Sequence, residues 1–563
     1  MKRAAPKAKI DTDILRVAQI AAAISIGAFL YFLRQDQLTL FGDAVAHMNI
    51  ARRVIDSRTP GLLQLGTVWL PLPHLLMLPF VASRYLWQTG MAGSFHSMLA
   101  YVFSTIGIFR LVRTVLPDST QTSTRTAVRF TSWLAAAGFA LNPNVVYMQA
   151  TAMTEPVYLA VFIWTLVFFA QAIKRCRAGD QARANKSLLW TALCLAAASL
   201  TRYDGWFLTA VVVLIAVVLS VARNFAPLRS GVVKLVIIAA IGPGLWLGYN
   251  AAVYGNALEF ANGPYSAKAI EQKTAVPGFP PHPGSDDLKI SFHYFFKSAE
   301  LNLAAGGIFD RNQTFATRIL QMLWVAALLL GTTIVALFQP KRWPVLLLWM
   351  PVPFYMLSIA HSGVPIFVPV WWPFSYYNVR YGVELIPAFA VLAAMAAYGL
   401  IRFASSVRAA AIIGGCFLAL VFTTYAHALK TGVVSYQEAV INARTRVALE
   451  KQLASIFETM PQNSTFLMYL GDHPGAFQRA GIPLSHVINE GNHRPWKRPT
   501  DPDGLWEKAL AHPASYVDYV IALDSDDVAR NVNKGEIDAL LVLHVTGQPA
   551  ATIYKTRKSN QPR

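Results

Sequence analysis

The chain has 563 residues, of which 55% are hydrophobic and only 14% are charged. Soluble domains usually carry about 25% charged residues. This composition and the mean hydropathy of +0.40 therefore argue against a soluble multidomain protein, a disordered chain or a fibrous one, and predict a membrane protein. Cys176, Cys194 and Cys416 lie in or beside apolar segments without metal-ligand spacing, which excludes a disulfide framework and a zinc knuckle.

Eleven stretches of the sequence are predicted to cross a membrane. Runs of about 18 or more mostly apolar residues are long enough to do so as helices. The first stretch has a basic flank but stays apolar through Phe29–Leu33, past any small-residue cleavage site, so we interpret it as an uncleaved anchor. The predicted spans are 14–33, 96–115, 127–145, 156–173, 187–204, 206–222, 232–250, 316–338, 343–360, 383–401 and 409–428.

The basic residues lie mainly on one side of these spans. With the N-terminus inside, the short loops on that side contain 21 basic and four acidic residues, whereas the opposite loops are nearly balanced before residue 430. A Lys/Arg bias of this kind orients a multi-pass protein with the basic loops in the cytoplasm. It also accounts for most of the formal net charge of +19, so no nucleic-acid partner is expected.

Three predicted outward loops are longer than simple connections need: 34–95, 251–315 and 361–382. In the first loop, apolar residues within 43–56 recur at helical spacing, which predicts a helix on the membrane surface. We expect the second loop to act as a lid over a substrate. The aromatic residues of the third loop are typical of a membrane interface, with stacking on a sugar as the alternative.

The sequence divides into a polytopic domain, 1–429, and a soluble α/β domain, 430–563, which the odd number of spans places outside. We expect Ser435 to cap a helix over roughly 436–460, where apolar residues recur three and four apart. Strand-like runs follow at 466–470, 516–523 and 540–545.

Two acids stand at the predicted outer membrane boundary. Asp43 lies about ten residues beyond the first span, and Glu155 lies at the outward end of the fourth. Carboxylates at such a boundary are costly unless they have partners, which makes both candidates for a functional site. The structural alternative is that each is a helix N-terminal acid stabilised by the helix dipole.

Two arginines occupy similar positions. Arg202 and Arg380 are isolated cations at outward ends of spans, beside Tyr203 and Tyr381. Arginine can bind a phosphate through two parallel hydrogen bonds, so we interpret these residues, with Tyr381, as a phosphate site. The alternatives are arginines that snorkel to the interface and an interfacial pair of Arg202 with Asp204.

The order of these motifs resembles that of polytopic glycosyltransferases of the C superfamily, in the branch of the protein O-mannosyltransferases and the bacterial lipid A aminoarabinose transferases. The resemblance covers most of residues 14–430 and depends on the order of the motifs rather than on any one of them. The motifs are GDAVAHMNIA (42–51), WLPLPHLL (69–76), TEP (154–156), LTRYDGW (200–206) and VRYGVELIP (379–387).

The resemblance implies a sugar donor carried on polyprenyl or dolichyl phosphate and a reaction with inversion at the anomeric carbon. It implies that Asp43 is the general base and Glu155 the second carboxylate of the site. The chain departs from the family pattern at Ala44, where a second acid is common, and at Pro71 or Leu72, where a Lys or His is common. We expect His74 to substitute as a phosphate ligand.

A metal site is a further hypothesis. His47 lies four residues after Asp43, so a helix there puts both side chains on one face, and Glu155 would complete a set of oxygen and nitrogen ligands. Such a set suits Mg²⁺ or Mn²⁺, with Zn²⁺ as a further option. The alternative is an interfacial histidine without a metal.

The sequence therefore predicts a multi-pass transferase of a bacterial inner (plasma) membrane, with its C-terminal domain on the periplasmic or extracellular side. It would move a sugar from a polyprenyl-phosphate donor to a glycan, lipid or protein acceptor. A secondary transporter is the alternative from another class, although transporters place ionisable groups near the membrane midplane and often contain inverted repeats. A lipid-linked glycan polymerase or ligase is the third alternative.

Overall fold

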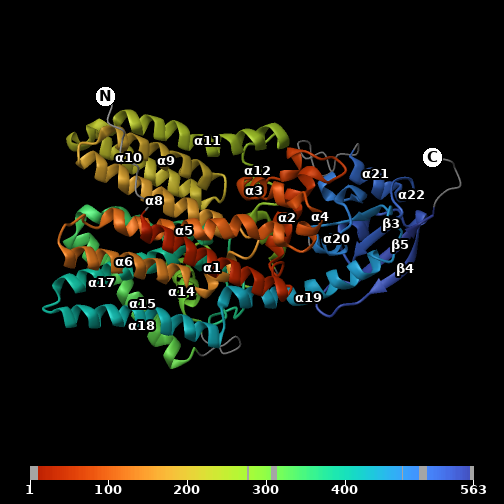
Figure 1. Ribbon diagram of the computed structural model, residues 1–563. Coiled ribbons are helices and arrows are strands. Elements are labelled where there is room, and N and C mark those ends of the chain that lie inside the picture. Colours follow the sequence, from red (N-terminus) through yellow and green to blue (C-terminus); the bar gives the residue numbers. More distant parts are fainter. Residues whose placement is uncertain (1–10, 276–277, 306–312, 472, 493–503, 558–563) are drawn as a thin grey trace.

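The structure, a computed structural model, describes residues 11–275, 278–305, 313–471, 473–492 and 504–557. Helices form most of the chain up to Phe457, and a small sheet follows. Figure 1 shows the long helices side by side in one bundle and the sheet at one end of it. The predicted fold class, a multi-pass helical membrane protein with a C-terminal α/β domain, is confirmed.

Within the described residues, nine helical segments are long and apolar enough to cross a membrane. Each of the eleven predicted spans falls on a helix, but α6 (Thr122–Ala140) and α9 (Gln181–Ser199) begin with polar turns and are not among the nine. The count of eleven spans therefore stays a prediction. The other helices of the bundle are α1 (Thr12–Arg34), α5 (Ser94–Val115), α8 (Glu155–Arg177), α10 (Asp204–Val221), α11 (Arg229–Tyr254), α15 (Phe315–Thr333), α16 (Pro351–His361), α17 (Ile386–Phe403) and α18 (Val407–Thr431).

The chain between α15 and α16 is irregular. A π-helical turn, η4 (Ile334–Phe338), is followed by a non-helical residue, Gln339, and then by the 3₁₀ helix η5 (Pro340–Trp349). Pro340 and Pro344 have no backbone N–H to donate, so a regular α-helix cannot continue through this segment. A second 3₁₀ helix, η6 (Val379–Leu385), leads directly into α17.

Two helices form the centre of the bundle. We compared an apolar 18-residue stretch of each span. In α8, 78% of these residues are buried, and in the span that includes α17, 89% are buried, compared with 22% in α1. Small residues permit this packing: at Gly331, where α15 meets α17, an added Cβ would collide with the backbone carbonyl of Leu392. Glu155 and Arg380 therefore lie at the beginning of the two most enclosed spans.

The first long loop, 34–95, is largely helical. The predicted helix within 43–56 is present as α2 (Gly42–Ile55), while its position on a membrane surface stays a prediction. Most of its side chains are buried, because it packs on α3 and contacts the C-terminal domain, where Asn49 Nδ2 donates to Gln478 Oε1 at 2.9 Å. The other elements here are η1 (Leu62–Leu65), α3 (Leu72–Val81), α4 (Arg84–Gln88) and η2 (Met91–Gly93).

The second long loop, 251–315, also contains helices, although its residues 276–277 and 306–312 lie outside the described residues. Two short helices precede a longer buried one that packs on η6 and α16. These helices and the short helix before α8 are α12 (Glu259–Asn262), α13 (Ala267–Thr274), α14 (Leu288–Leu303) and α7 (Pro143–Met148).

The C-terminal domain contains a five-stranded mixed sheet of order β2-β1-β3-β5-β4. The central β3 pairs in parallel with β1 and antiparallel with β5, while β1 pairs in parallel with the edge strand β2 and β5 pairs antiparallel with the edge strand β4. The predicted strands correspond to β1, β3 and β4; β2 is only two residues long and β5 carries polar residues, so neither was predicted. The strands are β1 (Phe466–Met468), β2 (Val487–Ile488), β3 (Tyr519–Leu523), β4 (Ile537–Leu543) and β5 (Ala551–Thr556).

A long helix, α19 (Val434–Phe457), joins this sheet to the bundle. The predicted cap at Ser435 is wrong, because the N-cap residue is Val433 and Ser435 lies inside the helix. Ser435 is fully buried, and its Oγ donates to Asn302 Oδ1 at 2.8 Å while its backbone N–H donates to Asn144. The start of α19 is therefore held within the bundle. The remaining helices of the domain are α20 (Gly475–Ala480), η7 (Leu484–His486), η8 (Glu490–Asn492), α21 (Leu505–Ala511), α22 (Pro513–Tyr516), α23 (Asp527–Asn531) and η9 (Lys534–Glu536).

Candidate functional site

Six of the seven predicted site residues border one cavity of about 490 Å³ at the end of the bundle that carries the C-terminal domain. Its walls come from α2, the start of α8, the connection between α9 and α10, α13, α16 and η6. Residues far apart in the sequence therefore meet here. The six residues are Asp43, His47, Glu155, Arg202, Arg380 and Tyr381.

Arg380 is hydrogen-bonded to two carboxylates and lies within ion-pair distance of a third. Its Nη2 donates to Asp43 Oδ2 at 2.5 Å, and its Nη1 and backbone N–H donate to the two oxygens of Glu438 at 2.8 and 2.9 Å. Its Nε lies 3.4 Å from Glu155 Oε1. The guanidinium also lies 5.2 Å from the centroid of the Phe41 ring. These contacts fix the guanidinium at the cavity wall, so the snorkelling alternative does not describe Arg380.

Arg202 has a similar set of partners. Its Nε lies 3.1 Å from Asp204 Oδ2, as the pairing alternative predicted, but Nη1 also lies 3.3 Å from Glu155 Oε1. Its Nη2 lies 3.2 Å from Glu384 Oε1 and donates to the Tyr355 hydroxyl at 2.9 Å. Arg202 is therefore part of a network that extends well beyond one interfacial pair.

Glu155 joins the two arginines. Its side chain is 1% exposed, and Arg202 and Arg380 both approach its Oε1. It is the first residue of α8, where the positive end of the helix dipole favours a carboxylate. The structural reading of Glu155 as a helix N-terminal acid is thus compatible with its place between two cations. Asp43 differs, because its side chain is 41% exposed and reaches the open cavity.

Tyr381 lies against both cations. The guanidinium carbons of Arg202 and Arg380 each lie 5.0 Å from the centroid of the Tyr381 ring. An aromatic face attracts a cation, and the attraction is stronger where water is excluded. Tyr381 therefore orients the two arginines relative to each other.

His74 does not border the cavity. It is fully buried behind His47, and its Nε2 lies 2.9 Å from His47 Nδ1. Burial lowers the pKa of His47 to about 3, with further lowering by Arg380 and Arg202, and burial likewise lowers the pKa of His74 well below its usual value. Two neutral imidazoles share one hydrogen bond here, so we leave His74 out of the phosphate site.

The side chains do not fit the metal hypothesis. Within the residues that the structure describes, no group of three His, Cys, Asp or Glu side chains is arranged to hold a metal ion. Asp43 and Glu155 instead share the Arg380 guanidinium, and His47 is bonded to His74.

The sequence reasoning missed three residues of this network: Glu384, Tyr355 and Glu438. Glu384 lies four residues after Arg380 inside the VRYGVELIP motif, so its spacing was an available signal. The Tyr355 hydroxyl donates to Glu384 Oε1 at 2.9 Å. Tyr355 lies in a predicted span that contains no charged residue, so nothing in the sequence indicated a role for it. Glu438 lies in the predicted soluble domain and reaches the site because α19 begins inside the bundle.

The loop 251–315 contributes Phe260 and Lys268 to the cavity wall. Lys268 is exposed. The role of this loop as a lid stays a prediction, but its position over the cavity is compatible with it.

Comparison with known proteins establishes the fold. The chain is similar to ArnT from Cupriavidus metallidurans bound to undecaprenyl phosphate, with a TM-score of 0.52 and 12% identity over 98% of this chain and 99% of that one. It is less similar to the oligosaccharyltransferase AglB from Archaeoglobus fulgidus in complex with an inhibitory peptide and a dolichol-phosphate, with a TM-score of 0.44 and 12% identity over 91% of this chain and 69% of that one.

No protein-family model matches the chain, and no curated protein is a significant match in sequence. The similarity to ArnT, at 12% identity, shows a shared fold that extends over nearly the whole of both chains. The fold expected from the resemblance to the C superfamily is thus confirmed.

Proposed function

We propose that this protein is a membrane glycosyltransferase that moves a sugar from a polyprenyl-phosphate donor to an acceptor hydroxyl with inversion. The observation that carries the proposal is a single cavity in which a half-exposed carboxylate, Asp43, lies beside two guanidiniums, Arg202 and Arg380. A general base and phosphate-binding cations are the groups that such a transfer needs. ArnT, a lipid A aminoarabinose transferase that shares the fold, binds undecaprenyl phosphate in its structure.

In the proposed reaction, the acceptor oxygen attacks the anomeric carbon of the donor sugar. As that C–O bond forms, the bond from the anomeric carbon to the phosphate oxygen breaks, and its electron pair leaves on the lipid phosphate. The acceptor proton passes to the Asp43 carboxylate. A single displacement of this kind inverts the anomeric carbon, so no covalent sugar-enzyme intermediate forms.

The arginines would stabilise the charge that grows on the leaving phosphate. Arg380 already donates to Asp43, so a phosphate oxygen that takes over this bond would release the carboxylate to accept a proton. Phosphate binding and activation of the base would then be coupled. Glu438 and Glu155 would keep the guanidinium in position during the exchange.

We propose the inner membrane as the location, with the cavity and the C-terminal domain on the periplasmic or extracellular side, in agreement with the basic loops on the other side. The acceptor is a glycan, a lipid or a protein. A transporter is less well supported, because the charged network lies at the ends of spans rather than at their centres. A lipid-linked glycan polymerase or ligase would be a variant of the same transfer.

The test is transfer by the purified full chain in detergent, with radiolabelled polyprenyl-phosphate sugars as donors and an envelope lipid and glycan extract as acceptor. We expect label to leave the donor and appear in acceptor, and the released lipid to be the polyprenyl phosphate. The proposal would be contradicted if the protein is folded and binds the lipid but every radiolabelled donor remains intact.

A further inference from the structure

A second cavity, of about 520 Å³, lies at the other end of the bundle. Its walls come from the end of α5, the end of α8 and the irregular segment around Gln339. Glu155 begins α8 at the candidate site, and Arg177 ends the same helix at this second cavity. A helix of 23 residues is about 33 Å long, close to the thickness of the hydrocarbon core, so the two cavities lie at opposite ends of a helix long enough to cross a membrane.

The polar part of this cavity is basic. Lys174, Arg177, Lys341 and Arg342 border it, and none of the described residues in its wall is acidic. Lys174 pairs with Asp118 at 2.8 Å, but that aspartate is 86% exposed, so solvent screens the pair strongly. The cavity therefore keeps an excess of positive charge that suits an anion.

Two buried polar atoms in the wall lack a partner. Arg342 Nη1 and Gln339 Oε1 are shielded from solvent and make no hydrogen bond. The Arg342 guanidinium also lies 4.9 Å from the Tyr398 ring centroid, which fixes its position. Buried donors and acceptors are normally satisfied, so a ligand that offers an anionic oxygen to Arg342 and a hydroxyl to Gln339 would satisfy both atoms once the two side chains turn toward the cavity.

The rest of the wall is apolar. Val115, Leu116 and Ile173 border the cavity, and Phe338, which also borders it, is 68% exposed on the bundle surface. The backbone break at Gln339 lies at the same place, and non-helical backbone at a membrane boundary is tolerated where it borders a polar cavity. A ligand with an acyl chain beside its phosphate would contact both kinds of wall, whereas a free phosphate would contact only the basic part.

We propose that this second cavity binds the headgroup of an anionic phospholipid with a hydroxyl-bearing headgroup, of which phosphatidylglycerol is the simplest. Basic pockets between transmembrane helices are known to bind such headgroups on the cytoplasmic side, which is the side that the loop charges predict here. The phosphate would bind Arg342 and Lys341, and a glycerol hydroxyl would donate to Gln339. This site is independent of the transfer reaction.

The experiment measures lipid retention by the purified full chain with native mass spectrometry, and the melting temperature in the same detergent. Phosphatidylglycerol, phosphatidylcholine, glycerol phosphate and inorganic phosphate are the four probes. We expect phosphatidylglycerol alone to be retained and to raise the melting temperature. Equal retention of phosphatidylcholine, or an equal effect of the two soluble phosphates, would overturn the proposal.

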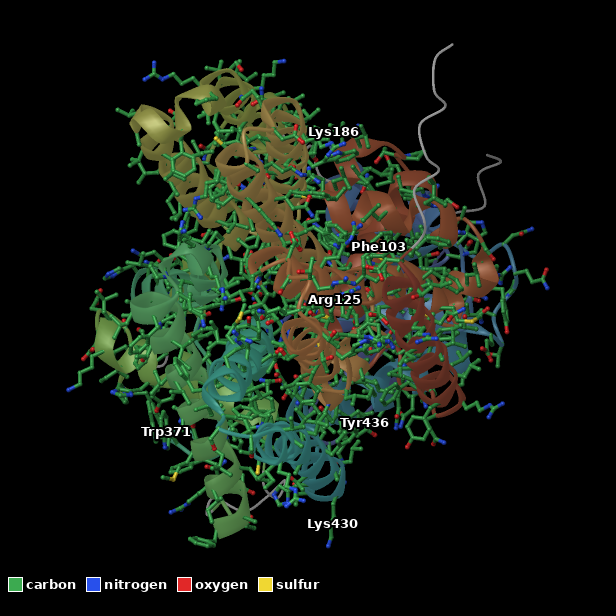
Figure 2. The ribbon with its side chains drawn as sticks, turned by 60° about the vertical axis from the view of Figure 1, so that its left-hand side comes forward. Phe103, Arg125, Lys186, Trp371, Lys430 and Tyr436 are labelled. Carbon is green, nitrogen blue, oxygen red and sulfur yellow. The ribbon has the colours of Figure 1, made fainter. Side chains whose placement is uncertain are left out.

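Variants locate the site. Lys341→Gln with Arg342→Gln should weaken phosphatidylglycerol binding roughly tenfold or more, because charge-assisted hydrogen bonds are lost. Arg125→Gln with Lys186→Gln is the matched control, since both residues are exposed on α6 and α9, do not border the cavity and are labelled in Figure 2. Equal weakening in both doubles would overturn the proposal. If the first double does not fold, Lys174→Gln with Lys341→Gln replaces it, since both side chains are exposed.

Discussion

Arg380 Nη2 and Asp43 Oδ2 are 2.5 Å apart although 337 positions separate the two residues in the sequence. The proposed base and one proposed phosphate-binding cation are therefore joined in the structure without a donor. On the proposed mechanism, a donor phosphate that takes over the Arg380 guanidinium frees the Asp43 carboxylate to accept the acceptor proton.

Asp43→Asn tests the base. The amide keeps the size of the side chain but cannot accept the proton, so we expect transfer to fall by at least about 10²-fold with normal membrane insertion. Asp36→Asn is the control, because Asp36 lies in the same loop and pairs instead with Lys451 and Arg479 of the C-terminal domain. Transfer near the wild-type rate in Asp43→Asn would remove Asp43 from this role.

Arg380→Lys tests phosphate binding. Lysine keeps the charge but loses the planar fork, so we expect donor-lipid affinity to fall roughly 10- to 100-fold, the equivalent of about 1.5–3 kcal/mol. Arg446→Lys is the matched control, since Arg446 donates to both oxygens of the buried Glu450 away from the cavity. Donor affinity is measured with the thermal stability of each variant. Equal affinities in the wild type and in folded Arg380→Lys would contradict the assignment.

Glu155→Gln separates a site carboxylate from a structural one. The change removes the charge that both guanidiniums share, so we expect the turnover of folded protein to fall roughly tenfold or more, with some loss of stability. Glu450→Gln provides the comparison, because Glu450 is also fully buried between two arginines, Arg446 and Arg479. It should lower stability and leave turnover unchanged. A Glu155→Gln protein that loses only stability would make Glu155 structural.

His47 predicts a pH dependence of stability. Its pKa falls from about 6.5 to about 3 on folding, so the neutral form is favoured in the folded state. The stability that His47 contributes is complete above pH 6.5. As the pH falls from 6.5 towards 3, the free energy of unfolding decreases by at most about 1.4 kcal/mol per pH unit. The melting temperature should decrease less between pH 7 and pH 5 in His47→Gln than in the wild type. Parallel decreases would show that another group titrates.

Cysteine labelling tests the topology. In a background without Cys176, Cys194 and Cys416, an impermeant thiol reagent applied to intact cells should label Ser455→Cys and not Ser405→Cys. Both serines are exposed, one on α19 and the other between α17 and α18. Labelling of both after permeabilisation is the control. The reverse pattern in intact cells would put the cavity on the cytoplasmic side.

The apolar pattern of the sequence is enough to predict a helical membrane fold. Continuous apolar runs identify the helices, because a bilayer requires about 20 apolar residues whatever their neighbours are. The sequence also identified Asp43, Glu155, Arg202 and Arg380 as unusual, since charges at a membrane boundary stand out against apolar surroundings. All four residues border one cavity, as expected for residues of a single site. Their chemical roles stay predictions.

Which charges meet depends on how the helices pack and could not be predicted from the sequence. Glu438 is an ordinary helical glutamate in the sequence, and it becomes a partner of Arg380 because Ser435 and its neighbours hold the start of α19 inside the bundle. His74 was selected for its place beside prolines, yet it faces His47 away from the cavity. Spacing along one helix predicts contacts three or four residues apart, whereas contacts between helices depend on how each is rotated and packed, which is decided by the whole core.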